Sequence, residues 1–450
     1  MTSGAPPGYL SPDLSRVGPF PPGSTLHGST RDSMSSTWYI AYVVLAGAAL
    51  IQGLLLIVQA WEHRRYTRSC LRTHHRYGAT GRAMVIAPCK GADIELEGHL
   101  RALLRQDYGD YEVTFVVESA DDPACAVVRR VMAEHPRAAV RLLVAGKATD
   151  CGQKVHNLRA ATARIPRGIE YLAFADSDAG SRPQWLRLAL ARLVRRNRGA
   201  TTGYRWFIPE RPSLANHLLY SINSNIVSLW TANSHYLLWG GSWALTRDTF
   251  DALGLHAAWA GTLSDDLVAS RVLRRARRPV RFEPTCMMAS PIDYTFRGMF
   301  QFLRRQYLIG RYYAPGWWLF ALLAATLRNL IWPLTLVAVA SGALSGTPPP
   351  WLSVALAGAT YLAGVVRAWL VQDLVRIHFP ERCQSMRTAQ RFDVWCWPLA
   401  GTVHWFALVS SAFGRHTTWR GIRYRLFRGG GVAMEQRDEE PAPAVLRRAA

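Results

Sequence analysis

Acidic residues are scarce in this chain. Its 450 residues include 31 Asp and Glu against 53 Lys and Arg, which gives a formal net charge of +22. Such an excess fits an anionic partner, whether nucleic acid, anionic lipid or an anionic nucleotide substrate. The basic residues gather beside long apolar runs rather than along a soluble domain. This pattern favours an anionic membrane surface, and no nucleic-acid partner is expected.

The seven cysteines lack the Cys-x-x-Cys spacing of a metal or redox motif. A structural zinc site and a disulfide scaffold are therefore not expected, and a reducing cytosolic environment is the default. The sequence also has no internal repeat. Residues 1–36 are rich in Pro, Gly and Ser and are predicted to be disordered. Their length before the first apolar run argues against a secretory signal peptide.

The first apolar run, residues 37–61, is long enough to span a bilayer. Trp38 and Trp61 lie at its two ends, where interfacial aromatic residues are common. Six arginines follow within residues 62–82, against the single acid Glu62. The positive-inside rule then predicts that the N-terminus lies outside and that the chain enters the cytosol after this run.

Further apolar runs lie toward the C-terminus. Residues 317–340 and 351–371 are predicted to span the membrane, joined by a linker without charge. Residues 394–413 are apolar too, but they contain Pro398 and His404 and precede a basic segment. That segment favours an inside C-terminus, so we expect a re-entrant or interfacial element here, with a full span as the alternative.

The region between the apolar runs alternates two patterns. Short buried-strand patterns occupy residues 83–87, 111–117, 140–144 and 171–175, and helical patterns separate them. Strands that alternate with helices indicate an α/β domain with a mostly parallel sheet.

Two acidic pairs carry the chemistry of this region. Asp176 and Asp178 directly follow the apolar run 171–175, which places two carboxylates at the carboxyl edge of the sheet, where such sheets bind ligands. Hard oxygen ligands there suit Mg²⁺ or Mn²⁺ held against a diphosphate, although Asp-x-Asp is also turn chemistry. Asp265 and Asp266 open a later helical pattern, where a helix cap is the simpler interpretation.

An ordered set of short motifs extends from about residue 83 to about residue 430. They are Ala87-Pro88-Cys89-Lys90-Gly91, Asp107-Tyr108, Glu112-Val113, Asp121-Asp122-Pro123-Ala124, Gly146-Lys147, Lys154 with Asn157, Asp176-Ser177, and the segment from Trp419 to Leu426. In this set the chain resembles the ceramide glucosyltransferases, inverting membrane glycosyltransferases with a GT-A fold. The family typically has Asp-Ser-Gly at this position. This chain has Asp176-Ser177-Asp178 instead, and the additional acid strengthens the interpretation of a metal site.

The resemblance implies roles for individual residues. Asp122, Lys154 and Asp176 would belong to the nucleotide-sugar pocket, with Asp176 also a metal ligand. Asp266 would be the general base that takes the proton of the acceptor hydroxyl, and Asp265 would orient it. Local chemistry offers alternatives, since Asp122 before a proline is a good helix cap and Lys154 could be an ordinary surface lysine.

Gln301, Arg304 and Arg305 resemble the Gln-x-x-Arg-Trp motif of membrane glycosyltransferases. The resemblance implies that this element closes over diphosphate and acceptor, where an arginine stabilises the departing charge. Arg305 stands where the motif has Trp, or else the register is shifted by one. A basic interfacial helix that touches anionic lipid is the alternative interpretation.

The resemblance implies a GT-A nucleotide-sugar-binding domain with transmembrane helices on its N- and C-terminal sides. The expected reaction moves a sugar, glucose in the simplest case, from a UDP-sugar to a membrane lipid hydroxyl, with ceramide as the expected acceptor. A hopanoid or other lipid acceptor and a processive polysaccharide synthase are alternatives. A non-catalytic scaffold is disfavoured, because it has no use for the acids. The expected divisions are a disordered extension (1–36), an anchor (37–61), the cytosolic domain (62–316), a transmembrane or re-entrant region (317–413), and a basic interfacial segment with a disordered tail (414–450).

Overall fold

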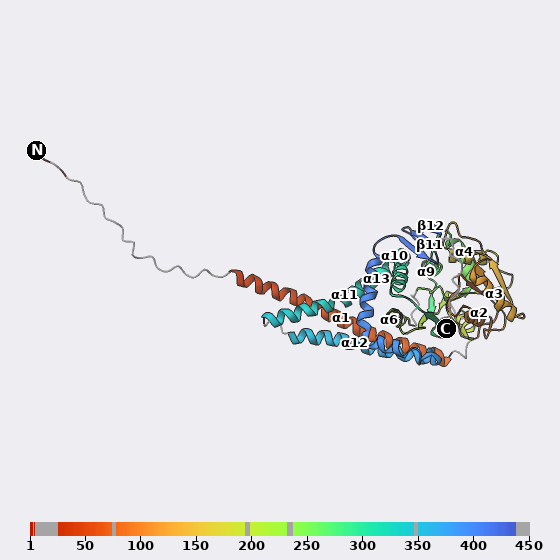
Figure 1. The fold of residues 1–450 in the computed structure, drawn as a ribbon, viewed down its shortest axis with the longest axis horizontal. Coiled ribbons are helices and arrows are strands. Elements are labelled where there is room, and N and C mark those ends of the chain that lie inside the picture. Colours follow the sequence, from red (N-terminus) through yellow and green to blue (C-terminus); the bar gives the residue numbers. More distant parts are fainter. Residues whose placement is uncertain are drawn as a thin grey trace, which may run out of the picture.

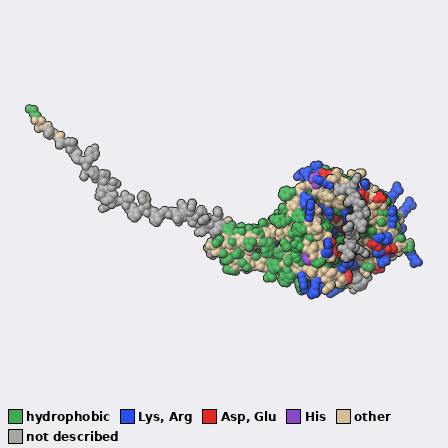
Figure 2. Space-filling model, in the orientation of Figure 1, with side chains coloured by type: hydrophobic (Ala, Val, Ile, Leu, Met, Phe, Trp, Pro, Cys, Tyr) green, Lys and Arg blue, Asp and Glu red, His purple; other side chains and the backbone are tan. Residues whose placement is uncertain are grey.

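A bundle of long helices projects from an α/β domain in the computed structural model (Figure 1). The bundle consists of α1 (Leu26–Thr73), α11 (Pro315–Ser345) and α12 (Pro350–His378). By length and composition, these three helices of the described chain could each cross a membrane. Hydrophobic side chains cover the bundle, whereas charged ones gather on the α/β domain (Figure 2). The structure describes residues 1–2, 4, 26–73, 78–193, 199–231, 237–345 and 350–437.

The first helix continues beyond the predicted anchor. It extends to Thr73, and its basic end lies against α12. There, Arg64 Nε lies 2.7 Å from Asp373 Oδ2, and Arg68 Nη2 lies 3.1 Å from the same oxygen. Part of the basic segment after the anchor is therefore used to join α1 to α12.

One helix runs across the bundle where the bundle meets the α/β domain (Figure 1). This helix, α13 (Arg387–Ser411), contacts α6 (Leu214–Val227), α10 (Phe296–Tyr313) and both C-terminal spans. It is kinked at Cys396, just before Pro398, whose ring removes one helical hydrogen bond. It contains residues 394–411, for which the interfacial placement stays a prediction.

The centre of the α/β domain is a seven-stranded mixed sheet in the order β3-β2-β1-β4-β7-β5-β8. The pairs β1–β2, β2–β3, β1–β4 and β5–β8 are parallel, while β7 runs antiparallel to β4 and β5. All four strands predicted from the sequence are present, and the predicted α/β class is confirmed. The strands are β1 (Arg82–Pro88), β2 (Tyr111–Val117), β3 (Val140–Val144), β4 (Ile169–Ala175), β5 (Ala200–Thr202), β7 (Ser242–Thr246) and β8 (Val280–Phe282).

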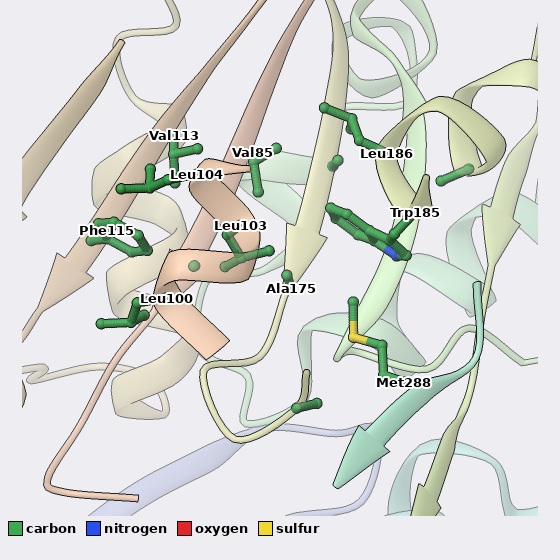
Figure 3. Close-up of a cluster of buried hydrophobic side chains, with 14 of the residues drawn as sticks. Val85, Leu100, Leu103, Leu104, Val113, Phe115, Ala175, Trp185, Leu186 and Met288 are labelled. Atoms are coloured by element: carbon green, nitrogen blue, oxygen red, sulfur yellow. The ribbon is translucent and has the colours of Figure 1, made fainter. Parts of the chain in front are cut away.

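Helices cover both faces of this sheet. Alternate residues of β1 face opposite ways, so that Val85 joins one hydrophobic core and Ile86 the other. Figure 3 shows the first core, in which Leu100, Leu103 and Leu104 pack against the strands. The helices around this core are α2 (Leu96–Leu104), α3 (Pro123–Glu134) and α5 (Trp185–Ala191). Those around the second are α4 (Gln153–Thr162), α7 (Arg247–Ala252), α8 (Leu255–Ala258) and α9 (Asp265–Arg275).

Two smaller sheets complete the fold. Strands β6 (Arg205–Pro209) and β9 (Met288–Ile292) form a parallel pair. After the helices α11 to α13, the chain returns to the α/β domain as a three-stranded antiparallel sheet. Its strands are β10 (His416–Trp419), β11 (Ile422–Leu426) and β12 (Val432–Arg437). The backbone amide of Gln153 donates a 3.1 Å hydrogen bond to the Tyr424 hydroxyl, and this bond links the sheet to α4.

Candidate active site

A cavity of about 480 Å³ opens beyond the carboxyl ends of β1 and β4. Five carboxylates line it, contributed by the loops after these strands and by the start of α9. An apolar wall comes from α6 and α10, whose side chains belong to one hydrophobic cluster. The carboxylates are those of Asp93, Asp176, Asp178, Asp265 and Asp266. The wall includes Leu219, Ile222, Ile226, Phe302 and Leu303.

Lys154 links two of the predicted acids. Its Nζ lies 2.7 Å from Asp176 Oδ1 and 3.2 Å from Asp265 Oδ1. Burial alone would lower the pKa of Lys154, but the two carboxylates raise that pKa above its usual range. The ammonium group therefore stays charged, and it neutralises part of the negative charge of the cavity.

Asp178 has an open ligand position. Its Oδ1 is buried and has no hydrogen-bond partner among the described residues. Burial raises the pKa of Asp178 to about 6, Asp176 adds to the rise, and Arg205 opposes it. A buried oxygen without a partner costs free energy unless a ligand takes the position. Together with Asp176 it offers two hard oxygen donors, a set that fits a divalent cation.

The start of α9 fixes the second acidic pair. Ser264 caps the helix, and its hydroxyl lies 2.5 Å from Asp266 Oδ1. The amide of Gly240 donates a 2.8 Å hydrogen bond to Asp266 Oδ2. A Cβ at position 240 would lie 2.7 Å from Lys154 Nζ and 3.1 Å from Asp266 Oδ2. Glycine therefore lets this backbone approach the charged groups without displacing the Lys154 ammonium group.

Asp265 is more deeply buried than Asp266. Its Oδ1 faces Lys154, while its Oδ2 is buried without a hydrogen-bond partner among the described residues. Burial raises the pKa of Asp265 to about 7, and Lys154 opposes that rise. Asp266 is only half-buried, so it is the member of the pair that a substrate can reach from the cavity.

Asp122 lies just outside the lining of the cavity. Its Oδ1 accepts hydrogen bonds of 2.8 Å from the amides of Ala124 and Gly91. The first bond caps α3, as the simpler interpretation expects, and the second fixes the loop after β1. The nucleotide role of Asp122 stays a prediction.

The structure separates the three residues of the Gln-x-x-Arg-like motif. Arg305 lines the cavity, whereas Gln301 is exposed on α10. Arg304 turns toward the C-terminal segment, where its Nη2 donates a 2.9 Å hydrogen bond to the Phe413 carbonyl. Burial lowers the pKa of Arg305 to about 10, and the positive charges of Arg205 and Arg420 contribute to the decrease. Of the three motif residues, Arg305 alone therefore lines the cavity.

Asp93, Arg205 and Arg420 are charged residues of the cavity that were not assigned a role from the sequence. Asp93 follows the Lys90-Gly91 motif, so its position after β1 was the available signal. Arg420 lies within the C-terminal motif, which was recognised without a chemical role. Arg205, at the start of β6, has no local sequence signal. All three line the cavity with Asp178.

Residues 42–432 match the model of glycosyl transferase family 21. The chain belongs to this family. It is therefore a glycosyltransferase, and its mixed sheet with a cavity at the carboxyl edge resembles the GT-A fold, as predicted. Membership also agrees with an association with membranes, which the three long apolar helices indicate.

Curated relatives match over shorter segments. Ceramide glucosyltransferase 3 of Caenorhabditis elegans is 25% identical over 142 residues, which are 31% of this chain and 29% of that protein. Ceramide glucosyltransferase 1 of the same organism is 31% identical over 101 residues, or 22% and 21% of the two chains. The matches thus span less than a third of these relatives.

Two solved structures show remote similarity. One is the mannosyltransferase PcManGT from Pyrobaculum calidifontis in complex with GDP-Man and Mn²⁺, with a TM-score of 0.43 and 16% identity. The match covers 82% of this chain and 97% of the mannosyltransferase chain. The other is GalNAc-T7 with UDP, GalNAc and Mn²⁺, with a TM-score of 0.37, 9% identity, and coverage of 50% and 48%.

Proposed function

We propose that this protein transfers a sugar, glucose in the simplest case, from a UDP-sugar to the hydroxyl of a ceramide-like membrane lipid. The observation that carries the proposal is the composition of one cavity. Carboxylates and arginines suited to a sugar nucleotide share it with the apolar wall of α6 and α10. The similarity to ceramide glucosyltransferases supports the acceptor class.

On the donor side, Asp178 and Asp176 would hold Mg²⁺ or Mn²⁺ against the diphosphate. The bound cation would withdraw charge from the leaving group. Arg305 would add a positive charge on the same side, and burial strengthens its attraction for phosphate oxygens. Lys154 would hold Asp176 in place through their 2.7 Å ion pair.

On the acceptor side, Asp266 would act as the general base. Its carboxylate is oriented by Ser264 and by the Gly240 amide, and it reaches the cavity. It would take the proton of the lipid hydroxyl as that oxygen attacks the anomeric carbon and the nucleoside diphosphate leaves. A single displacement of this kind inverts the anomeric centre, so a UDP-α-sugar would give a β-glycoside.

The apolar wall would receive the hydrocarbon part of the acceptor. Its helices α6 and α10 both contact α13, which lies where the bundle meets the α/β domain (Figure 1). A lipid in the adjacent leaflet would thus reach the carboxylates with its polar end. We further propose a multi-pass protein whose catalytic domain faces the cytosol, because the arginines after the first span favour that side.

The test is mass spectrometry of lipids from cells that lack glycosylated sphingolipid and express this protein or its Asp266→Asn form. We expect a hexosyl-ceramide with the unmodified protein and a rate lower by about 10²–10⁴ with Asp266→Asn. Asp251→Asn, on the exposed side of α7, is the matched control and should retain activity. Intact cells should not use externally added UDP-sugar, and its use would contradict the cytosolic placement.

Other products would redirect the assignment. A hexosylated lipid other than ceramide would overturn the ceramide acceptor and favour a hopanoid or another amphipathic alcohol. A polymer would favour a processive synthase. No product, despite good expression and adequate ceramide and donor, would contradict lipid glycosylation.

A further inference from the structure

A strained turn presents an arginine to the cavity. Strands β10 and β11 pair from Trp419 to Ile422, which leaves Arg420 and Gly421 as a two-residue hairpin loop. Both have positive φ, +50° for Arg420 and +73° for Gly421. Loops of this kind favour Asn or Gly at the first position, because other side chains crowd the backbone there. A long side chain in such a place suggests that the side chain itself is used.

The guanidinium group of Arg420 reaches across to the loop after β1. It forms an ion pair with Asp93, although the two residues lie 327 positions apart in the chain. Its Nη1 lies 3.5 Å from the position that a Cβ of Gly91 would occupy. About a third of the Arg420 side chain, 34%, remains exposed, so the ion pair can open without unfolding. The turn thus places a positive charge at the acidic cavity.

Arg420 belongs to a cluster of like charges. The guanidinium groups of Arg205 and Arg305 each lie over the ring of Phe302, at 5.4 Å from its centre. The charges of Arg205 and Arg420 both act on Arg305 and on Asp178. Positive groups held this close repel one another, and a bound anion with several charges relieves that repulsion. A diphosphate is an anion of this kind.

We propose that Arg420 binds the diphosphate of the sugar nucleotide and that its pair with Asp93 is the resting contact in the absence of donor. The inference rests on the proposed function, and it adds the C-terminal hairpin to the donor site. On donor binding, the guanidinium exchanges the Asp93 carboxylate for phosphate oxygens, which it can contact with two parallel hydrogen bonds. No covalent bond to Arg420 forms or breaks. Its charge stabilises the diphosphate as the bond to the sugar breaks.

The test compares the affinities for UDP and UMP, which differ by the phosphate that Arg420 would hold. Binding is measured by titration calorimetry on the full chain in neutral phosphatidylcholine nanodiscs with Mn²⁺. Arg420→Asn removes the guanidinium and leaves a residue that the turn prefers, so the unfolding temperature should not fall. We expect UDP affinity to fall at least about tenfold and UMP affinity to change less than about twofold. Arg420→Lys should recover part of the loss.

Arg423→Asn is the matched control, because Arg423 lies on the same hairpin, is exposed and pairs with Glu435 at 3.4 Å. It should bind both nucleotides like the unmodified protein. An unchanged UDP-to-UMP preference in Arg420→Asn would overturn the inference, as would equal losses in the Arg420 and Arg423 variants. If the unmodified protein did not bind UDP, the proposed function itself would fail, and this outcome is distinct from the other two.

A phosphorylated lipid headgroup offers the same oxygen atoms as a diphosphate. The titrations are therefore repeated with anionic phosphatidylglycerol in the nanodiscs. If Arg420→Asn kept the UDP preference in both lipids, and anionic lipid weakened UDP binding only in the unmodified protein, Arg420 would be a membrane contact and the donor role would be wrong. An effect on UDP in neutral lipid supports the donor role.

Discussion

Two carboxylates of the described chain, those of Asp393 and Asp178, lie in opposite surroundings. Asp393, at the junction of α6, α12 and α13, is fully buried, and its oxygens accept hydrogen bonds from three side chains. These donors are Ser221 at 2.5 Å, Ser224 at 2.7 Å and Gln372 at 2.5 Å. Asp178, in the cavity, keeps one oxygen without any partner in the described chain.

The difference separates a structural role from a binding role. Hydrogen-bond donors from α6 and α12 surround Asp393 on α13. Asp393 therefore has a structural role, which is to hold these helices together. Asp178 bears the cost of burial without that compensation, and the cost persists because the position serves a ligand. Burial alone would not distinguish the two acids. What distinguishes them is whether their hydrogen-bonding capacity is already used.

Asp178→Asn should produce the largest effect. The amide keeps the shape of the side chain but is a poor ligand for a hard cation, so we expect transfer to fall by at least about 10²-fold. Folding should be unaffected, since no protein donor loses its partner. Transfer rates over a range of Mn²⁺ concentrations, together with thermal unfolding, measure both quantities. Full activity in this variant would place the metal elsewhere and remove the contrast with Asp393.

Asp393→Ala should show the reverse pattern. Two serine hydroxyls and the Gln372 amide would lose their acceptor inside the protein, which costs about 3 kcal/mol of unfolding free energy. Transfer per folded molecule should stay within a few-fold of the original, because Asp393 lies outside the cavity lining. Thermal unfolding in detergent measures the loss, and active-site titration corrects the rate for unfolded protein. Loss of transfer without loss of stability would contradict a structural role.

Asp265 lies between these extremes, because one oxygen pairs with Lys154 and the other has no hydrogen-bond partner in the part of the chain that the structure describes. Since burial raises the pKa of Asp265 to about 7, only its ionised form above that pH pairs fully with Lys154. Transfer should therefore rise up to about tenfold per pH unit below pH 7 and level off above it. Asp265→Asn should remove the part of this rise between about pH 6 and about pH 7, while the part at lower pH, to which Asp178 contributes, should remain. A profile identical to that of the unmodified protein would contradict this prediction.

The same group has the opposite effect on stability. Its folded pKa lies above the ordinary value of 3.8, so the folded state binds the proton more tightly than the unfolded state. Its contribution to the unfolding free energy is thus greatest at low pH and is lost as the pH rises from about 4 to about 7. Denaturant titrations across this range, compared with Asp265→Asn, measure that slope.

The sequence predicted those parts of the fold that depend on local pattern. Continuous apolar runs identified β1 to β4, and the acids after β4 identified the edge of the sheet. The short strands β5, β7 and β8 were not predicted, because their pairing depends on partners far along the chain. The contact between Arg420 and Asp93 was not predicted either, because the two residues lie 327 positions apart in the chain. The roles of the predicted site residues stay predictions.

The C-terminal sheet determines when the cavity can be completed. Residues 417, 419 and 420 line it, and they follow every helix of the bundle in the order of synthesis. A ribosome that has made the whole α/β domain has therefore made an unfinished catalytic centre. The missing wall is added only after the helices that could enter the membrane have left the ribosome. Truncated chains that stop before the hairpin would lack part of the cavity, so chain order completes the cavity only after α11 and α12 have been made.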